Sequence, residues 1–210
     1  MFLVAGLGNP GEQYAATPHN MGFLVVDRLA ARHNIRMTRK ECQAIVGQGS
    51  IGGKTVLLVE PQTFMNLSGV AVKPLLEKNE IPARDLVLVY DELDLPWGSI
   101  RVRPNGRPAG HNGVADVIAK LGTEEFPRVR LGVHPGHALP SGKDYLLSRF
   151  TRRQNETLDS FIDLAADATE SIIARGVEMS MTKFNRRAQG SADGAPEDGS
   201  GMRGPKKEEE

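Results

Sequence analysis

The sequence contains a single cysteine, Cys42, so no disulfide can form within the chain and no thiolate metal site can be built from cysteine alone. This cysteine usage fits a reducing compartment, and we expect the protein to be cytoplasmic. No apolar run approaches the roughly 20 residues that a membrane helix needs. The opening residues MFLVAGLGN lack the basic start of a signal peptide and are typical of a first β-strand. We therefore expect no association with a membrane.

The chain also lacks an overall charge, because its 26 basic and 26 acidic residues cancel. The tail from Ala188 onward is rich in Gly, Ser, Pro and charged residues, and it holds six acidic but only three basic residues. We expect residues 188–210 to be a disordered polar tail and residues 1–187 to form one catalytic domain. That domain carries a net charge of +3, which permits a polyanionic partner without requiring one.

Within residues 1–187, apolar residues follow strand and helix patterns in alternation. The segment LVLVY at 86–90 is a continuous apolar run, typical of a central strand buried on both faces. Two β-type runs flank Gly52-Gly53 and predict a hairpin. The predicted strands are 2–5, 44–51, 54–60, 86–90, 99–103 and 129–133, and the predicted helices are 20–33, 66–79, 112–121, 156–175 and 179–185. This order predicts an α/β fold: a single three-layer domain with a mixed, twisted β-sheet flanked by helices.

Two glycine-rich segments imitate nucleotide-binding motifs. Gly6–Gly11 (GLGNPG) follows a strand, as a dinucleotide fingerprint does, but Pro10-Gly11 is a turn dipeptide where that motif requires a helix. In Gly47–Thr55 (GQGSIGGKT), Gln48 replaces the first required glycine, and a strand follows where a phosphate loop requires a helix. We therefore expect no nucleotide cofactor.

Five polar residues in loops or near element ends are candidates for chemistry: Asn9, His19, Asn66, Asp91 and Asn112. Each also has a structural interpretation. Asn66 and Asn112 are good helix N-caps, Asn9 precedes a proline in a turn, and Asp91 has arginine residues nearby in sequence. A lone histidine is more often a hydrogen-bonded structural residue than a catalyst.

Taken together, these residues favour hydrolysis by activated water. An aspartate at the end of a central strand is well placed to hold His19, which leaves the other ring nitrogen free to take a proton from water. The sequence contains no G-x-S-x-G motif for a serine nucleophile and no H-x-x-x-H spacing for a metal. The asparagine amides would then orient carbonyl groups or stabilise an oxyanion.

Four segments, in this order, resemble the signature blocks of bacterial-type peptidyl-tRNA hydrolases: GLGNPGEQYAATPHNMGF, EPQTFMNLSGVAV, VYDELDLPWGSIRVR and AGHNGVADVI. The likeness extends from Met1 to about Arg187 and omits the tail. It implies hydrolysis of the ester between a peptide and the ribose of its tRNA, which recycles tRNAs from aborted translation. Peptidyl-tRNA is the implied partner; we expect no cofactor, no metal and no obligate protein partner, and a monomer.

The resemblance also implies roles for residues. His19 is the base that activates water, Asp91 is its partner, and three amides position water and substrate: Asn9, Asn66 and Asn112. Met65 lines the peptide channel, and the implied substrate contacts include Tyr14, Phe64 and His111.

Basic residues hold the tRNA 5′ phosphate in the family, and the matching positions here are Arg101, Arg103 and Arg130. Because side chains alternate along a strand, Arg101 and Arg103 share one face, and guanidinium forks suit phosphate. The alternative is that these arginines merely form a solvated strand face.

The chain departs from the family pattern at Pro18, where the family usually has arginine before the histidine, and in a less glycine-rich loop at 105–110. The segment Leu131–Gly136 is one residue shorter than the family form. Two other functions remain as alternatives. One is a hydrolase-like RNA-binding protein without catalysis, which would not need His19 and its acid. The other is a small-molecule esterase, which would not need the arginines.

Overall fold

The computed structural model describes residues 1–185, so the tail predicted at 188–210, with its boundary near Arg187, lies outside the described residues. The strands are β1 (Phe2–Gly6), β2 (Arg39–Glu41), β3 (Ala44–Ile51), β4 (Lys54–Pro61), β5 (Leu86–Pro96), β6 (Ile100–Arg103) and β7 (Arg128–His134). The α-helices are α1 (Met21–Arg32), α2 (Ser68–Lys78), α3 (Asn112–Leu121), α4 (Gly142–Leu147), α5 (Arg152–Arg175) and α6 (Val177–Phe184). Short 3-10 helices are η1 (Glu12–Tyr14), η2 (Pro18–Asn20), η3 (Met65–Leu67) and η4 (Ala83–Asp85).

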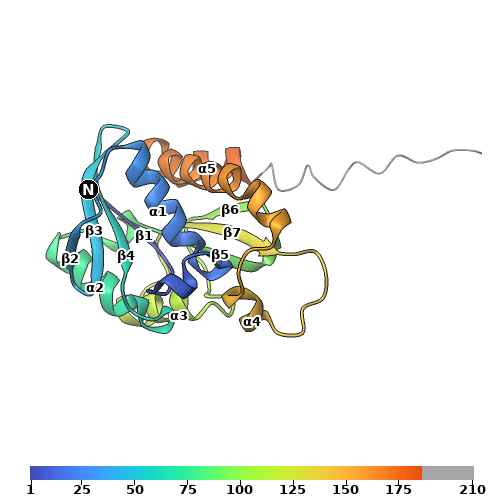
Figure 1. The fold of residues 1–210 in the computed structure, drawn as a ribbon. Coiled ribbons are helices and arrows are strands. Elements are labelled where there is room, and N and C mark those ends of the chain that lie inside the picture. Colours follow the sequence, from blue (N-terminus) through green and yellow to red (C-terminus); the bar gives the residue numbers. More distant parts are fainter. Residues whose placement is uncertain (186–210) are drawn as a thin grey trace, which may run out of the picture.

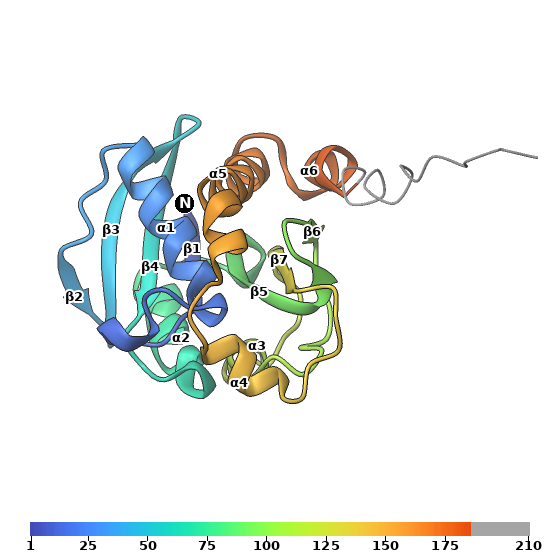
Figure 2. The ribbon, with the colours of Figure 1, turned by 45° about the vertical axis from the view of Figure 1, so that its right-hand side comes forward.

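The seven strands form one sheet in the order β2-β3-β4-β1-β5-β7-β6. Its centre is parallel, whereas the pairs β2–β3, β3–β4 and β6–β7 are antiparallel. Helices α1 and α5 cover one face and α2 and α3 cover the other (Figures 1 and 2). In β5, Val87 and Val89 face the α1 side, whereas Leu86, Leu88 and Tyr90 face the α2 side. The predicted three-layer α/β fold with a mixed sheet is confirmed.

The predicted elements differ from the observed ones in three places. Strand β5 continues to Pro96, so Asp91 lies within the strand and not after it. Strand β2 consists of the charged residues RKE and forms at the sheet edge by pairing with β3, which leaves no apolar pattern to predict it. Helix α4 has only six residues, too few for a helical period. None of the helices within residues 1–185 is long and apolar enough to cross a membrane.

A glycine contact between β1 and α1 positions the loop that carries His19. A β-carbon on Gly6 would lie 2.1 Å from the carbonyl oxygen of Gly22, and one on Gly22 would lie 2.3 Å from the nitrogen of Leu7. No larger residue fits at either position, so α1 begins directly against the backbone of β1. This contact fixes η2, which immediately precedes α1, at the carboxyl end of the central strands.

The two glycine-rich segments have the backbone that the sequence predicts for them. Gly11 has a φ of +111° and leads into η1, so no α-helix follows β1 directly. Lys54 and Thr55 are the first residues of β4 and do not begin a helix. Neither segment therefore offers the helix N-terminus on which a nucleotide phosphate would be held.

An acidic pair joins α1 to the end of β4. Glu60 is only 8% exposed and its carboxyl contacts that of Asp27, while its Oε1 has no hydrogen-bond partner within residues 1–185. Burial, followed by the charge and hydrogen bond of Asp27, raises the pKa of Glu60 to about 8. Burial also raises the pKa of Asp27. The folded protein therefore keeps a proton on this pair at neutral pH.

This pair predicts a stability that falls as the pH rises. An unfolded glutamate titrates near pH ~4.3, so between about pH 4.5 and 8 the folded state binds the proton more tightly. The free energy of unfolding should decrease across that window, by at most about 1.4 kcal/mol per pH unit for one proton. We expect Glu60→Gln, which keeps a donor for Asp27, to flatten this dependence in urea unfolding series at pH 5, 6.5 and 8. Identical slopes for wild type and variant would contradict the assignment.

Candidate active site

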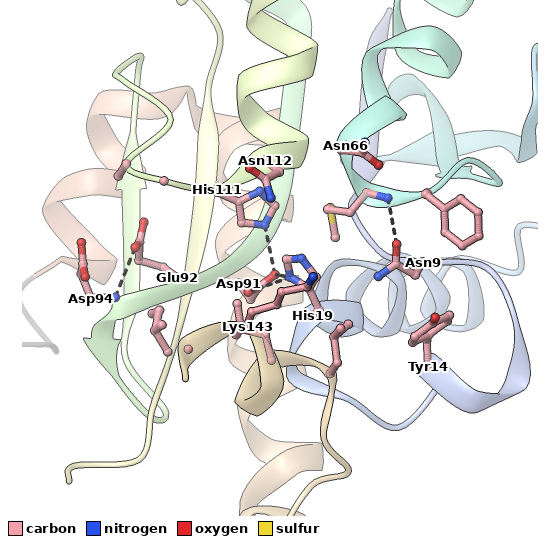
Figure 3. A pocket seen from close by; sticks show the side chains of 18 residues that line it. Asn9, Tyr14, His19, Asn66, Asp91, Glu92, Asp94, His111, Asn112 and Lys143 are labelled. Atoms are coloured by element: carbon pink, nitrogen blue, oxygen red, sulfur yellow. Dashed lines mark hydrogen bonds and ion pairs between the residues drawn. The ribbon is translucent and has the colours of Figure 1, made fainter. Parts of the chain in front are cut away.

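A pocket of about 720 Å³ opens at the carboxyl ends of the central strands (Figure 3). Its walls come from the loop after β1, from η3, from the end of β5, from the start of α3 and from α4. All nine of the residues predicted for catalysis or for substrate binding line it: Asn9, Tyr14, His19, Phe64, Met65, Asn66, Asp91, His111 and Asn112. The fold thus gathers into one cavity residues that lie as far apart in the sequence as Asn9 and Asn112.

Asp91 lies on the floor of this pocket between two histidine rings. His19 Nδ1 lies 2.9 Å from Asp91 Oδ1 and 3.1 Å from Oδ2. His111 Nε2 lies 3.1 Å from the same Oδ1. Asp91 is 1% exposed, whereas the side chain of His19 is 13% exposed and borders the cavity. Since Nδ1 faces the carboxylate, His19 presents Nε2 to the cavity.

The protonation of His111 follows from its own contacts. Its Nδ1 accepts the backbone N–H of Val114 and so carries no proton. Nε2 therefore bears the hydrogen and donates it to Asp91. His111 lines the pocket, as the predicted substrate contact requires, but both of its ring nitrogens are bonded within the protein. His111 caps α3 and supports the carboxylate of Asp91.

The two rings also determine the charge of Asp91. Burial by itself would raise the pKa of this carboxyl, but attraction to His111 and His19 and their hydrogen bonds outweigh burial and lower the pKa below its usual value. Asp91 is consequently a carboxylate. A carboxylate that accepts the Nδ1–H of His19 fixes the ring tautomer and increases the basicity of Nε2.

These three side chains also form a cluster with metal-ligand chemistry, since one donor atom from each lies within 4.8 Å of the others. A metal ligand must offer a nitrogen lone pair, whereas His111 Nε2 carries a proton in the observed hydrogen-bond arrangement. The ring nitrogens of His19 and His111 also contact the Asp91 carboxylate directly, so the three ligand atoms face one another. The arrangement therefore fits a hydrogen-bonded relay better than an ion site.

Asn9 is oriented by contacts on both its backbone and its side chain. Asn20 accepts the backbone N–H of Asn9 at 2.9 Å and donates its own amide to the Asn9 carbonyl at 2.9 Å. The backbone N–H of Met65 donates to Asn9 Oδ1 at 2.8 Å. Because Oδ1 is thus occupied, the Nδ2 group of Asn9 is left as a donor, and it has no protein partner within residues 1–185. It lies on the same side of the pocket as His19 (Figure 3).

Asn66 and Asn112 lie at the pocket rim, and neither is a side-chain N-cap. Asn66 lies inside η3, and the cap of α3 is His111. Both residues are exposed, and their amides make no hydrogen bond within the described part of the chain. They are therefore free to bind a ligand. Phe64, two residues before Asn66, also lines the pocket with 60% of its surface exposed.

Pro18 is compatible with the position of His19. It is the buried first residue of η2, where its fixed φ suits a helical start. Thr17 before it has φ −127° and ψ 153°, the extended geometry that a residue preceding proline adopts. The substitution therefore keeps the local backbone and removes only a charge.

The predicted phosphate-binding arginines lie outside the pocket, on the β6–β7 edge of the sheet. Arg101 pairs in register with Arg130, and Arg103 with Arg128. The intervening residue Val102 is in the α1-side core, so the arginines face the opposite side. Arg130 donates from Nε to Glu92 at 2.8 Å, whereas Arg101 and Arg103 have no acidic partner within residues 1–185. The positive charge of this edge is only partly compensated.

Three residues of the site were not found from the sequence. The sequence pattern places Asn20 at the start of a helix, and nothing in its spacing indicates its hydrogen bonds to Asn9. Glu92 lies next to Asp91 but points to Arg130. Lys143 lies in the unpredicted helix α4, although Ser141 and Asp144 form a Ser-x-x-Asp start signal, and Ser141 Oγ does accept the Asp144 N–H at 3.2 Å.

Comparison with known proteins agrees with this geometry. Residues 3–192 match the family model described as peptidyl-tRNA hydrolase. A peptidyl-tRNA hydrolase of Solibacter usitatus is 57% identical over 190 residues, covering 90% of this chain and 97% of that protein. One of Acidobacterium capsulatum is 50% identical over 191 residues, covering 89% and 96%.

A solved structure shares the fold as well. The crystal structure of peptidyl-tRNA hydrolase from Acinetobacter baumannii superposes with a TM-score of 0.81 at 32% identity, covering 88% of this chain and 94% of that one. The matched segment includes every residue that lines the pocket. From its sequence, its fold and the contents of this cavity, the chain belongs to the peptidyl-tRNA hydrolase family.

Proposed function

We propose that this protein hydrolyses the ester bond between a peptide, or an N-blocked aminoacyl group, and the ribose of tRNA, and so releases the tRNA for reuse in translation. The observation that carries the proposal is the arrangement of His19. Its Nδ1 is bonded to the Asp91 carboxylate, and its Nε2 borders a cavity that also receives a free amide donor from Asn9. A base and an oxyanion donor in one pocket are what ester hydrolysis needs.

In the proposed reaction, water attacks the ester carbonyl carbon while Nε2 of His19 takes one of its protons. The imidazolium that forms is stabilised by Asp91. Asn9 Nδ2 donates to the substrate, either to the attacking water or to the carbonyl oxygen as it becomes negative. The carbon–oxygen ester bond then breaks, and the ribose oxygen leaves with the proton that His19 held. The products are a free carboxylic acid and a tRNA with a free terminal hydroxyl.

The amide groups of Asn66 and Asn112 and the apolar side chains of Met65, Phe64 and Tyr14 are proposed to hold the peptide. Amides bind the backbone of any peptide, whereas an exposed aromatic residue accepts various side chains. This combination suits a substrate whose sequence varies. General-base catalysis contributes only about 10²–10⁴-fold, so such positioning must supply the rest of the rate enhancement.

One assay tests this function against its alternatives. We expect the protein to release an N-acetylated amino acid from tRNA much faster than it cleaves a simple alkyl ester or an unblocked aminoacyl-tRNA. A catalytically inactive RNA-binding protein would bind all tRNAs and release nothing. A small-molecule esterase would cleave the simple ester equally well. The retained His19–Asp91 pair argues against the inactive alternative, because binding alone does not need it.

The arginines at the β6–β7 edge are proposed to bind tRNA phosphate. Arg101 and Arg103 are uncompensated within the described residues and share one face of β6, whereas Arg130 is held by Glu92. We therefore assign the main contacts to Arg101 and Arg103, with Arg130 as a more rigid neighbour. Long-range attraction at this edge would bring the RNA toward the pocket.

Removal of these two charges should weaken substrate binding and flatten its dependence on salt. Each lost phosphate contact reduces the slope of log K against log salt by about 0.9 for a duplex, so the Arg101→Gln, Arg103→Gln variant should lose ~1–2 units. A control is Lys40→Gln on β2, which removes one exposed charge at the opposite edge of the sheet. A slope unchanged from wild type, measured from 50 to 300 mM KCl, would mean that the arginines only form a solvated strand face.

The place of action is proposed to be the cytoplasm, where peptidyl-tRNA is produced. We also propose that the protein acts as a monomer without an obligate protein partner. The support for this is that the base, its acid and the oriented amides all come from one chain.

A further inference from the structure

Helix α4 brings a charged side chain into the pocket that the reaction described above does not use. Lys143, Leu146 and Leu147 all line the cavity. Residues spaced by three and four lie on one face of a helix, so α4 turns a single face toward the pocket, with Lys143 at its start. Figure 3 shows Lys143 in front of His19 and Asp91, on the side of the cavity away from α3.

The helix that carries Lys143 is held in place by contacts on its other side. The hydroxyl of Tyr145 donates to the carbonyl oxygen of Val133 at the end of β7, and the side-chain amide of Gln154 donates to the same hydroxyl at 2.8 Å. Ser141 caps the first turn. Hydrogen bonds within the fold therefore hold α4, and with it the backbone of Lys143, beside the pocket.

The charge of Lys143 is not neutralised by the protein. Its side chain is exposed and forms no ion pair within residues 1–185. Asp91 is occupied by two histidines and Glu92 by Arg130. The remaining acid of the pocket, Asp94, is not within ion-pair distance of Lys143. The cavity thus contains one ammonium group that is available to an anionic ligand.

The surroundings of Lys143 indicate which anion this is. On one side of His19 lie the amides and apolar side chains proposed to hold the peptide; on the other lie Glu92 and Arg130, which lead to the arginine edge. An RNA that reaches the ester beside His19 from that edge enters the cavity that Lys143 also lines. The phosphate nearest the ester is the one that joins the last two nucleotides, and an ammonium group binds phosphate as a point charge.

We propose that Lys143 is a further substrate-binding residue, whose ammonium binds the phosphodiester next to the 3′-terminal nucleotide of the tRNA. The proposal rests on the proposed function. It adds a phosphate contact inside the pocket to the ones at the arginine edge. This contact positions the single-stranded end of the RNA, and with it the ester, over Nε2 of His19.

Two substrates separate this role from others. The first is N-acetylaminoacyl-tRNA, and the second is the same acyl group esterified to adenosine, which has no phosphate. For Lys143→Ala we expect kcat/KM with tRNA to fall about three- to tenfold, chiefly through KM, and the slope of log(kcat/KM) against log salt to decrease by ~0.7. Activity on acyl-adenosine should not change. Lys143→Arg should restore the tRNA activity, and Lys40→Ala is the matched loss of one exposed lysine.

The other outcomes overturn the proposal. An equal loss with both substrates would mean that Lys143 acts on the ester or on the pocket itself. No loss with either substrate, or a loss matched by Lys40→Ala, would mean that it makes no specific contact. If the wild-type protein cleaves neither substrate, the proposed function fails, which is a different result from a failure of Lys143→Ala alone.

Discussion

Replacing His19 with alanine should reduce the turnover of N-acetylaminoacyl-tRNA by about 10²–10⁴-fold and leave tRNA binding nearly unchanged. The reason is geometric. Among the described residues that line the pocket, His19 is the histidine with a ring nitrogen that no protein group occupies, because His111 uses both of its own. Without His19, none of the described histidines that line the pocket has a ring nitrogen free to take the proton from water. The measurement is kcat under saturating substrate, together with the dissociation constant for uncharged tRNA.

A matched control for this variant is His33→Ala. His33 follows α1, outside the pocket, and its Nε2 lies 3.0 Å from Glu170. We expect this variant to keep wild-type kcat. If His19→Ala retained near-normal hydrolysis, the base would have to be another group and the mechanism would be wrong. A large loss of tRNA binding would instead show that His19 mainly holds substrate.

Replacing Asp91 with asparagine should lower kcat by a similar factor, although it removes no atom that touches water or ester. The carboxylate accepts two ring N–H groups, one from His19 and one from His111. An asparagine that keeps its oxygen at the Oδ1 position, where His111 donates, places its NH₂ group at the Oδ2 position, 3.1 Å from His19 Nδ1, so that a ring N–H there would face another donor. Since His111 is fixed by the backbone N–H of Val114, His19 must adopt the tautomer that carries hydrogen on Nε2. In that tautomer Nε2 has no lone pair with which to take a proton from water, and a comparable change in a catalytic triad costs about 10⁴-fold.

Asp91→Asn must be distinguished from simple unfolding, because Asp91 is 1% exposed. The variant should therefore be tested for its thermal midpoint and for tRNA binding before kinetics. Asp159→Asn is the matched carboxylate-to-amide control. Asp159 is exposed on α5 and forms an ion pair with Arg28 on α1. A folded Asp91→Asn variant with tRNA binding intact and kcat within about tenfold of wild type would contradict the tautomer argument.

The sequence predicted well those features that are encoded locally. The continuous apolar run at 86–90 predicted a strand with two buried faces, and Val87 and Leu88 do belong to opposite cores. The hairpin around Gly52-Gly53 was predicted because turn residues and strand residues are adjacent in the chain. Strand β2 and helix α4 were missed because they are short and their backbone pairing or capping, not an apolar period, stabilises them.

By itself, the sequence determined the class of fold, the family blocks and the identity of the polar residues near the ends of elements. Only the tertiary structure decided which hydrogen bonds and ion pairs those residues make, and therefore which role each can have. In the structure, His111 donates to Asp91 and Arg130 donates to Glu92. The backbone N–H of Met65 orients the amide of Asn9, and Lys143 lines the pocket. The physical reason is that hydrogen bonds and ion pairs depend on distances of about 3 Å between atoms far apart in the chain. Close contacts such as Gly6 against Gly22 fix those distances, and no local pattern records them.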